Sequence, residues 1–151
     1  MRTLETESDR ESIAGRISAL TSSDQRLWGK MSAHQTLCHL CDSYKLVLGE
    51  RSVNMATGFL QRTLIKFIAL RAPMKWPHGV STRPEMEQGA GGTAPVEFER
   101  DRSQLLSIID RFCSSAIDPK IRHPIFGPMT RPEWMRWGYL HADHHLRQFG
   151  R

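Results

Sequence analysis

Apolar residues recur three or four positions apart in successive stretches of the chain, which is the spacing of an amphipathic helix. In the first stretch, from Glu7 to Leu20, Ile13 and Ile17 keep this spacing. A second helix is predicted from Ser32, because Ser32 and Gln35 fit the capping-box pattern. No stretch shows the sustained alternation, rich in β-branched residues, that predicts a strand.

A third helix is predicted over Ala56 to Ala72, with its apolar residues packed along one side. These residues are Phe59, Leu60, Leu64, Phe67, Ile68 and Leu70. Its other positions are polar and basic, so the segment fits either a helix that lies on a membrane surface or a bundle helix with one solvated face. The second interpretation is the commoner one for such a segment, and we expect it here.

The segment from Ala72 to Ala94 interrupts the helical pattern, because it holds three prolines and four glycines. A stretch of this length without secondary structure of its own is uncommon in a compact domain, and is often a lid or a binding loop. Trp76, His78 and Met86 are the side chains that such a loop would fold over a site. A partly ordered surface loop is the open alternative.

Two more helices complete the pattern. Pro95 is predicted in the first turn of a helix that runs to about Cys113 or Ala116. Its inward residues are Phe98, Leu105, Ile108, Ile109 and Phe112. The last helix begins at Thr130, which forms a second capping box with Glu133.

Four helices of bundle length, with the N-terminal stretch in addition and no strand, predict an all-α fold, a four-helix bundle. The chain has 151 residues, which is enough to bury a core, and residues 1–151 are predicted to form a single domain. Helical repeats would show an internal period, and none is found.

The net charge is +5, but the lysines and arginines form no long run, so no nucleic-acid partner is expected. The stretch from Met1 to Arg10 is charged and lacks the apolar core of a signal peptide. The longest apolar run, Leu64 to Leu70, is far shorter than the roughly 20 residues of a membrane span. Three cysteines, an odd number, indicate reduced thiols. We therefore expect a cytoplasmic protein with no membrane partner.

Three of the seven histidines lie within five residues of the last helix. Positions spaced four, three, four and three apart form a core-facing seam in such a helix. The seam is Trp134, Gly138, His141, His145 and Gln148. A polar group that faces a core costs on the order of a few kcal/mol unless it is paired. Either a bound metal ion or a hydrogen-bonded network would pair these groups.

His141 and His145 lie one turn apart, so both rings can reach one ion, and neutral imidazole suits zinc, nickel, copper or iron. Two ligands rarely hold a metal, and His39 in the second helix is the candidate third ligand. His144 lies off the seam, and we expect it on the solvent side or at the rim of the site.

Other residues of these helices are weaker candidates. His34 and Tyr44 are candidates to line the site, and Gln148 is a candidate to orient a ligand nitrogen or a substrate. Cys38 and Cys41 have C-x-x-C spacing, so a soft zinc site with His34 is one interpretation. Zinc sites of this kind sit on tight turns and need a second ligand pair, so we expect two buried thiols instead.

Three stretches of the chain, taken in order, carry a family resemblance: Trp28 to Leu40, His123 to Pro128, and His141 to Gly150. They resemble the DinB-like (YfiT-like) superfamily of metal-dependent hydrolases and transferases, and within it a group of short bacterial proteins of unknown function. Together they bracket most of the chain, from about residue 28 to residue 150.

The resemblance implies a four-helix bundle in which one histidine of the second helix and an H-x-x-x-H pair of the last helix bind a divalent metal. When the family's ligand positions are transferred to this sequence, the resemblance implies that the ligands are His39, His141 and His145 and that the metal is nickel or zinc. The resemblance also implies a small-molecule substrate, a low-molecular-weight thiol such as bacillithiol or mycothiol in some members, and a homodimer. The sequence departs at residues 146–148, where Leu-Arg-Gln replaces the Arg-Gly-Gln common in the family.

The leading hypothesis is a three-histidine metal site with an open coordination position, used by a thiol-dependent transferase or by a hydrolase. The ligand set contains no acid, and no glutamate stands near it in the sequence, which favours thiol transfer over hydrolysis. Two alternatives remain open. One is a bundle whose metal is structural or sensory, and the other is a bundle with a histidine network and no metal.

Overall fold

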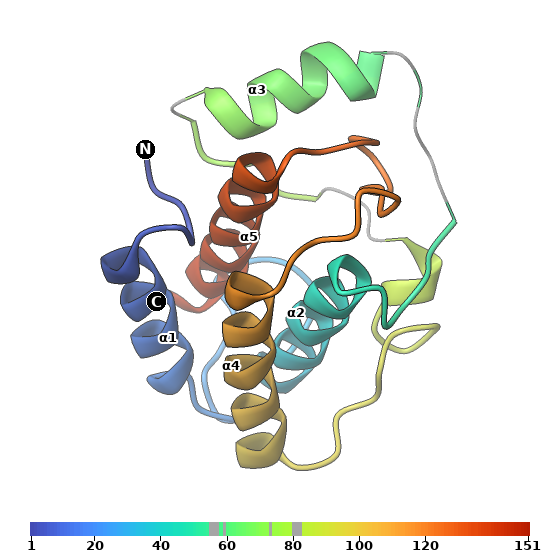
Figure 1. The fold of residues 1–151 in the computed structure, drawn as a ribbon. Coiled ribbons are helices and arrows are strands. Elements are labelled where there is room, and N and C mark those ends of the chain that lie inside the picture. The colour runs from blue at the N-terminus through green and yellow to red at the C-terminus, as the bar shows by residue number, and fades with distance from the viewer. Residues whose placement is uncertain (55–57, 59, 73, 80–82) are drawn as a thin grey trace.

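The computed structural model describes residues 1–54, 58, 60–72, 74–79 and 83–151, and Figure 1 shows their path. The α-helices of these residues are α1 (Glu7–Ser18), α2 (Ala33–Val47), α3 (Lys66–Arg71), α4 (Phe98–Ser114) and α5 (Arg131–Leu146). A π-helical segment, Gln61–Ile65, leads into α3, and short 3-10 turns lie at Pro84–Met86 and Arg147–Phe149. No β-strand occurs within the described ranges, which confirms the all-α prediction. None of their helices is both long enough and apolar enough to cross a bilayer.

The two predicted capping boxes fix where α2 and α5 begin. The Ser32 hydroxyl accepts a hydrogen bond from the Gln35 amide at 3.1 Å, and the Gln35 side chain accepts one from the Ser32 amide at 2.9 Å. Thr130 and Glu133 make the same reciprocal pair at the start of α5. Both predictions are confirmed. Each box satisfies two amide groups that a helix start leaves without intrahelical partners, so the first turn of each histidine-bearing helix is well defined.

α4 begins later than predicted. Pro95 lies outside the helix, and Glu97 is the N-cap residue. The Glu97 carboxylate accepts hydrogen bonds from the amides of Glu99 and Arg100 at 3.0 and 2.6 Å. A carboxylate at this position satisfies two free amides at the positive end of the helix, which a proline ring cannot do. The observed end at Ser114 agrees with the prediction.

The apolar residues around α3 do not pack as predicted. The exposed fractions are 61% for Leu60, 57% for Leu64 and 63% for Phe67. Of the predicted apolar set within the described residues, only Leu70 is buried. The prediction of a helix packed along one side was therefore wrong for this segment. Its predicted start at Ala56, and Phe59, lie outside the described residues.

Figure 1 shows the reason: α3 lies across one end of the bundle instead of alongside the other helices. Only a narrow part of its surface can therefore reach the core. Polar contacts fasten it to α5, because Lys66 pairs with Glu133 at 3.1 Å and Arg136 donates from Nε to the Leu70 carbonyl at 3.1 Å. The core itself is formed mainly by the other four helices.

A tight contact between α2 and α5 sets the separation of the two helices near the histidines. The buried Tyr44 hydroxyl donates to the Gly138 carbonyl at 2.8 Å. A Cβ atom at position 138 would lie 3.0 Å from the ring of Phe112 in α4 and from Leu4, so glycine here permits the close packing of α5 against α4 and the N-terminal segment. Tyr44 follows His39 by five positions and Gly138 precedes His141 by three, so the contact lies close to both histidines along their helices.

Candidate metal site

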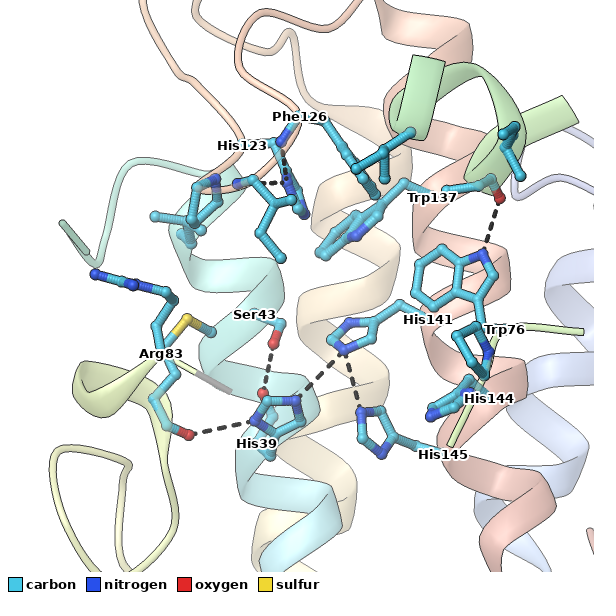
Figure 2. A pocket seen from close by; sticks show the side chains of 18 of the residues that line it. His39, Ser43, Trp76, Arg83, His123, Phe126, Trp137, His141, His144 and His145 are labelled. Atoms are coloured by element: carbon cyan, nitrogen blue, oxygen red, sulfur yellow. Dashed lines mark hydrogen bonds between the residues drawn. The ribbon is translucent and has the colours of Figure 1, made fainter. Parts of the chain in front are cut away.

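Three histidine side chains point toward one another between α2 and α5 (Figure 2). The Nε2 atom of His141 lies 3.4 Å from Nε2 of His39 and 3.1 Å from Nε2 of His145. His39 and His145 are buried, while His141 is half-buried and lines the adjacent cavity. The structure thus brings together the three residues that the sequence selected as metal-ligand candidates, with their ligand atoms all within 4.8 Å of one another.

Hydrogen bonds at the outer edges of two rings leave lone pairs at the centre. His39 donates from Nδ1 to the Met86 carbonyl at 3.3 Å, and His145 donates from Nδ1 to Oε1 of Gln148 at 2.9 Å. A neutral imidazole carries one N–H, so Nε2 of each of these rings is a bare acceptor. His141 could donate from Nε2 to only one of them, and its own Nδ1 is buried with no hydrogen-bond partner among the described residues. His141 Nδ1 therefore stays unpaired in either tautomer, and at least one of the Nε2 lone pairs at the centre lacks a donor, which a cation bound there would supply with a partner.

The separations suit a single ion. Imidazole nitrogens bound at about 2.0–2.1 Å in a tetrahedral arrangement stand about 3.3 Å apart. The observed distances of 3.1 and 3.4 Å lie on either side of that value. Burial lowers the pKa of His39, His141 and His145, so the rings are neutral, which is the form that binds a metal. The donor set therefore fits a divalent ion such as zinc or nickel.

Gln148 is held in place by the segment that precedes α2. The Leu27 amide donates to the Gln148 carbonyl at 2.6 Å. Gly29 lies against the glutamine side chain, because a Cβ atom there would come within 2.5 Å of Gln148 Nε2. The φ of Gly29 is +87°, a conformation that favours glycine. Gln148 therefore reaches the site through His145 and does not line the cavity itself.

A buried carboxylate holds the loop that carries Met86. Asp42 is fully buried and accepts hydrogen bonds from Arg51 at 3.0 Å and from the amide and hydroxyl of Thr93 at 2.8 and 2.6 Å. Arg51 also donates to two backbone carbonyls of this loop. The sequence interpretation missed this support for the His39 partner. The available signal was Asp42, three positions after His39 in an apolar helix, since a carboxylate buried there needs a charged partner.

A cavity of about 420 Å³ opens beside the three histidines. Its walls are mostly apolar and aromatic, and no aspartate or glutamate is found among the described residues that line it. Trp137 stacks on the His141 ring with 5.0 Å between ring centroids, and Trp76 lies 6.2 Å from the same ring. The size and the apolar walls are typical of a small-molecule site.

The loop after α3 contributes to this cavity in part as predicted. Trp76 and Met86 both line it, and the Trp76 indole donates from Nε1 to the Ala69 carbonyl at 2.8 Å, which ties the loop back to α3. His78 does not line it. That exposed ring stacks on Trp28 with 3.7 Å between centroids, so it joins the loop to the segment before α2.

His144 lines the cavity, which is one of the two positions that we expected for it, and does not lie on the solvent side. It is buried and lines the cavity, because the Trp28 ring covers it at 4.9 Å between centroids. Its Nδ1 atom has no hydrogen-bond partner among the described residues. Burial lowers the pKa of His144 to about 4, so the ring is neutral at physiological pH. Helical periodicity alone could not show that the segment before α2 covers this side of α5.

The other sequence candidates on α2 lie outside the cavity. His34 Nε2 lies 2.7 Å from an Asp101 oxygen that also accepts from Cys38 Sγ at 3.6 Å. Burial raises the pKa of the Cys38 thiol to about 12, and Cys41 is likewise buried, so both behave as buried thiols. Tyr44 lies in the core. His34 and Tyr44 are therefore members of neither the cavity lining nor the three-histidine group.

Comparison with known proteins agrees with this geometry. The sequence profile of the DinB superfamily matches residues 7–149, which is nearly the whole chain. Searches among curated proteins and among solved structures gave no match. The matched range includes α1 through α5 and all three histidines of the site. The chain therefore belongs to the DinB superfamily.

Proposed function

We propose that this protein is a metal-dependent enzyme, in which His39, His141 and His145 hold a divalent ion and a low-molecular-weight thiol is transferred to a small-molecule substrate. The observation that supports it best is the meeting of three Nε2 atoms, short of hydrogen-bond donors, at the wall of an apolar cavity. Nickel or zinc is the metal that we propose, because both accept neutral imidazole ligands.

The open geometry favours a catalytic over a structural ion. Structural zinc sites are closed by four protein ligands, whereas catalytic sites keep three and leave one position for water or substrate. The described residues offer a third protein ligand to His141 and His145, namely His39, but no fourth in the same group. Because the group borders a cavity, a small molecule can reach the remaining position.

The lining of the cavity favours thiol transfer over hydrolysis. A divalent ion held by three neutral ligands lowers the pKa of a thiol or water bound beside them. Hydrolytic zinc sites commonly add a carboxylate that takes a proton from water, and the described lining has none. In the proposed transfer, the thiol loses its proton to solvent and its sulfur forms a bond to an electrophilic carbon. The leaving group departs from that carbon with the bonding electron pair.

The residues around the ligands have defined tasks in this proposal. Met86 and Gln148 hold the Nδ1 protons of His39 and His145, so that both Nε2 lone pairs face the ion. Trp76 lines the cavity as an apolar surface that excludes water, which strengthens electrostatic interactions inside.

The test combines metal analysis with a thiol-conjugation assay. The chain, purified without a histidine tag, is expected to bind close to one zinc or nickel ion, and the loaded protein to accelerate conjugation of bacillithiol, mycothiol or cysteine to monochlorobimane. His141→Ala should abolish both properties, whereas His34→Ala, which alters a histidine outside the cavity, should retain both. Metal content well below one ion per chain in the wild type, unchanged in His141→Ala, would exclude the proposal. One bound ion without acceleration by any of these thiols would favour the structural or sensory alternative.

A further inference from the structure

The cavity beside the three histidines has a one-sided charge pattern. The cationic side chains of its described lining are Lys75 and Arg83, and that lining includes no carboxylate. The histidines themselves are neutral, because burial lowers their pKa. A divalent ion would add positive charge that no acid in the lining offsets. The described lining therefore contains no negatively charged group that would balance these cations.

Arg83 lies at the edge of the cavity, and Figure 2 shows it on the side of His39, away from Trp76. Its side chain is half-buried, and its Nε atom is buried with no hydrogen-bond partner among the described residues. None of the ion pairs formed by those residues includes Arg83. Arg83 therefore lines the cavity without a counter-charge in bonding contact among the described residues.

The neighbouring acid, Glu85, is hydrogen-bonded through one oxygen, while its Oε2 atom is buried without a partner among the described residues. Its Oε1 accepts hydrogen bonds from the Asn54 amide at 3.1 Å and from the Asn54 side chain at 2.6 Å. The pKa of the Glu85 carboxyl is lowered first by hydrogen bonds from its own amide and from Asn54, and least by the charge of Arg83. Glu85 forms no ion pair with Arg83 among the described residues, so no direct bond from this acid occupies the guanidinium.

The chemistry of the two cations differs. Lys75 is exposed, so its ammonium group stays hydrated and discriminates little between ligands. Arg83 carries a planar fork of N–H donors that matches a carboxylate with two parallel hydrogen bonds. A partly desolvated donor without an acceptor is costly, and a bound carboxylate would remove that cost. Aromatic and aliphatic walls, among them Phe126 and Trp137, would accept an apolar body beside it.

We propose that the cavity binds a small amphipathic carboxylate, with its apolar body against the aromatic walls and its carboxylate on Arg83. This inference rests on the proposed function for the role of the cavity as the substrate site, and it adds the chemical class of the substrate. It assigns Arg83 as the residue that selects an acid over its neutral analogue.

The test uses a matched pair of compounds, 4-phenylbutyrate and its neutral amide, 4-phenylbutanamide, with binding measured by calorimetry on the zinc-loaded protein. The wild type is expected to bind the acid at least about tenfold more tightly than the amide. This ratio corresponds to the lower end of the free energy of one hydrogen bond to a charged group. Arg83→Gln should remove most of that preference, and Arg83→Lys should retain part of it. Arg100→Gln, which changes an exposed arginine outside the cavity by the same charge, should retain all of it.

A second arm separates this inference from the metal proposal. In His141→Ala, which lacks a complete ligand set, the preference for the acid should persist and should still be lost when Arg83→Gln is added. A preference that disappears in His141→Ala but survives in Arg83→Gln would mean that the carboxylate binds the ion, and would overturn the assignment of Arg83. Failure of the acid to bind any of these proteins at millimolar concentration would overturn it as well. Absence of metal from the wild type would contradict only the proposed function, provided that the effect of Arg83→Gln remains.

Discussion

The Nδ1 atom of His145 donates a hydrogen bond to Oε1 of Gln148, one turn further along the chain, at 2.9 Å. This bond fixes which nitrogen of His145 carries the proton, and it turns the Nε2 lone pair toward His39 and His141. A second-layer partner of this kind orients a metal-binding imidazole and raises its basicity. The relationship makes Gln148 the most direct test of whether the three rings are arranged for an ion.

Replacing Gln148 by leucine removes the acceptor while nearly conserving volume, and should weaken zinc or nickel binding by about 10–100-fold. Competition against a chromophoric chelator would measure the change. Gln25→Leu, at an exposed position of the same residue type, provides the control. Equal affinities for the wild type and both variants would exclude an orienting role for Gln148.

Removal of the metal should lower the melting temperature, because an ion that binds only the folded chain stabilises it by mass action. At a free ion concentration 100 times the dissociation constant, the stabilisation is about 2.7 kcal/mol. Differential scanning calorimetry with and without a chelator would show the shift, and added zinc should reverse it. His141→Ala should melt at one temperature in all three conditions. An unchanged wild-type melting temperature after verified metal removal would contradict an ion that bridges α2 and α5.

The stability of the metal-free protein should decrease as the pH falls below about 6.5, the usual pKa of an unfolded histidine. His123 is buried, its Nδ1 accepts from the amides of Ile125 and Phe126 at 3.1 Å each, and burial lowers its pKa to about 3. Between these pH values the unfolded chain binds a proton that the folded chain does not. The free energy of unfolding therefore decreases as the pH is lowered, by up to about 1.4 kcal/mol per pH unit for this residue. Above pH about 6.5 neither state binds this proton, and the stabilisation from the neutral His123 is fully present.

Urea denaturation at pH 7, 6 and 5 would measure this dependence. His123→Gln keeps an acceptor for the two amides but does not titrate, so its stability should vary less steeply over the same range. A variant that follows the wild-type curve would show that the proton uptake of the unfolded chain occurs at other groups.

Gly29→Ala should reduce both the stability and the affinity for metal. The left-handed φ of +87° and the 2.5 Å approach to Gln148 Nε2 both oppose a side chain at this position. We expect a loss of about 1–2 kcal/mol in the free energy of unfolding. Gly15→Ala is the matched control, because a Cβ atom added to Gly15 in α1 would meet no atom within 4 Å, and this variant should gain about 0.5–1 kcal/mol. Equal effects at the two glycines would exclude the packing of Gly29 against Gln148.

The predictable parts of this protein depend on residues close together in sequence. The capping boxes at Ser32 and Thr130 each lie within one helical turn, and the seam containing His141 and His145 follows from helical periodicity. His39 was a candidate because two ligands rarely hold a metal, and the family resemblance strengthened it, since a single histidine in a helix carries no pairing signal of its own. The sequence therefore predicted the fold class and the members of the three-histidine group.

The remainder depends on which surfaces meet, and periodicity does not encode that. The amphipathic pattern around α3 indicated a helix, but nothing local showed that it would lie across the end of the bundle and leave Phe67 exposed. The hydrogen-bond partner of His39 is the backbone carbonyl of Met86, and a pattern of side chains in the sequence cannot predict a contact with a backbone carbonyl. Asp42 and Arg51 hold that loop through contacts that form only when the chain has folded.

His39 precedes His141 by 102 residues, whereas His141 and His145 share one helical turn. The complete ligand group therefore exists only after two distant parts of the chain have come together. An ion bound there would stabilise the finished fold much more than any early, partly ordered state. It would accordingly slow unfolding without accelerating folding, so that the lifetime of the native protein, and not the time needed to reach it, would depend on the metal supply of the cell.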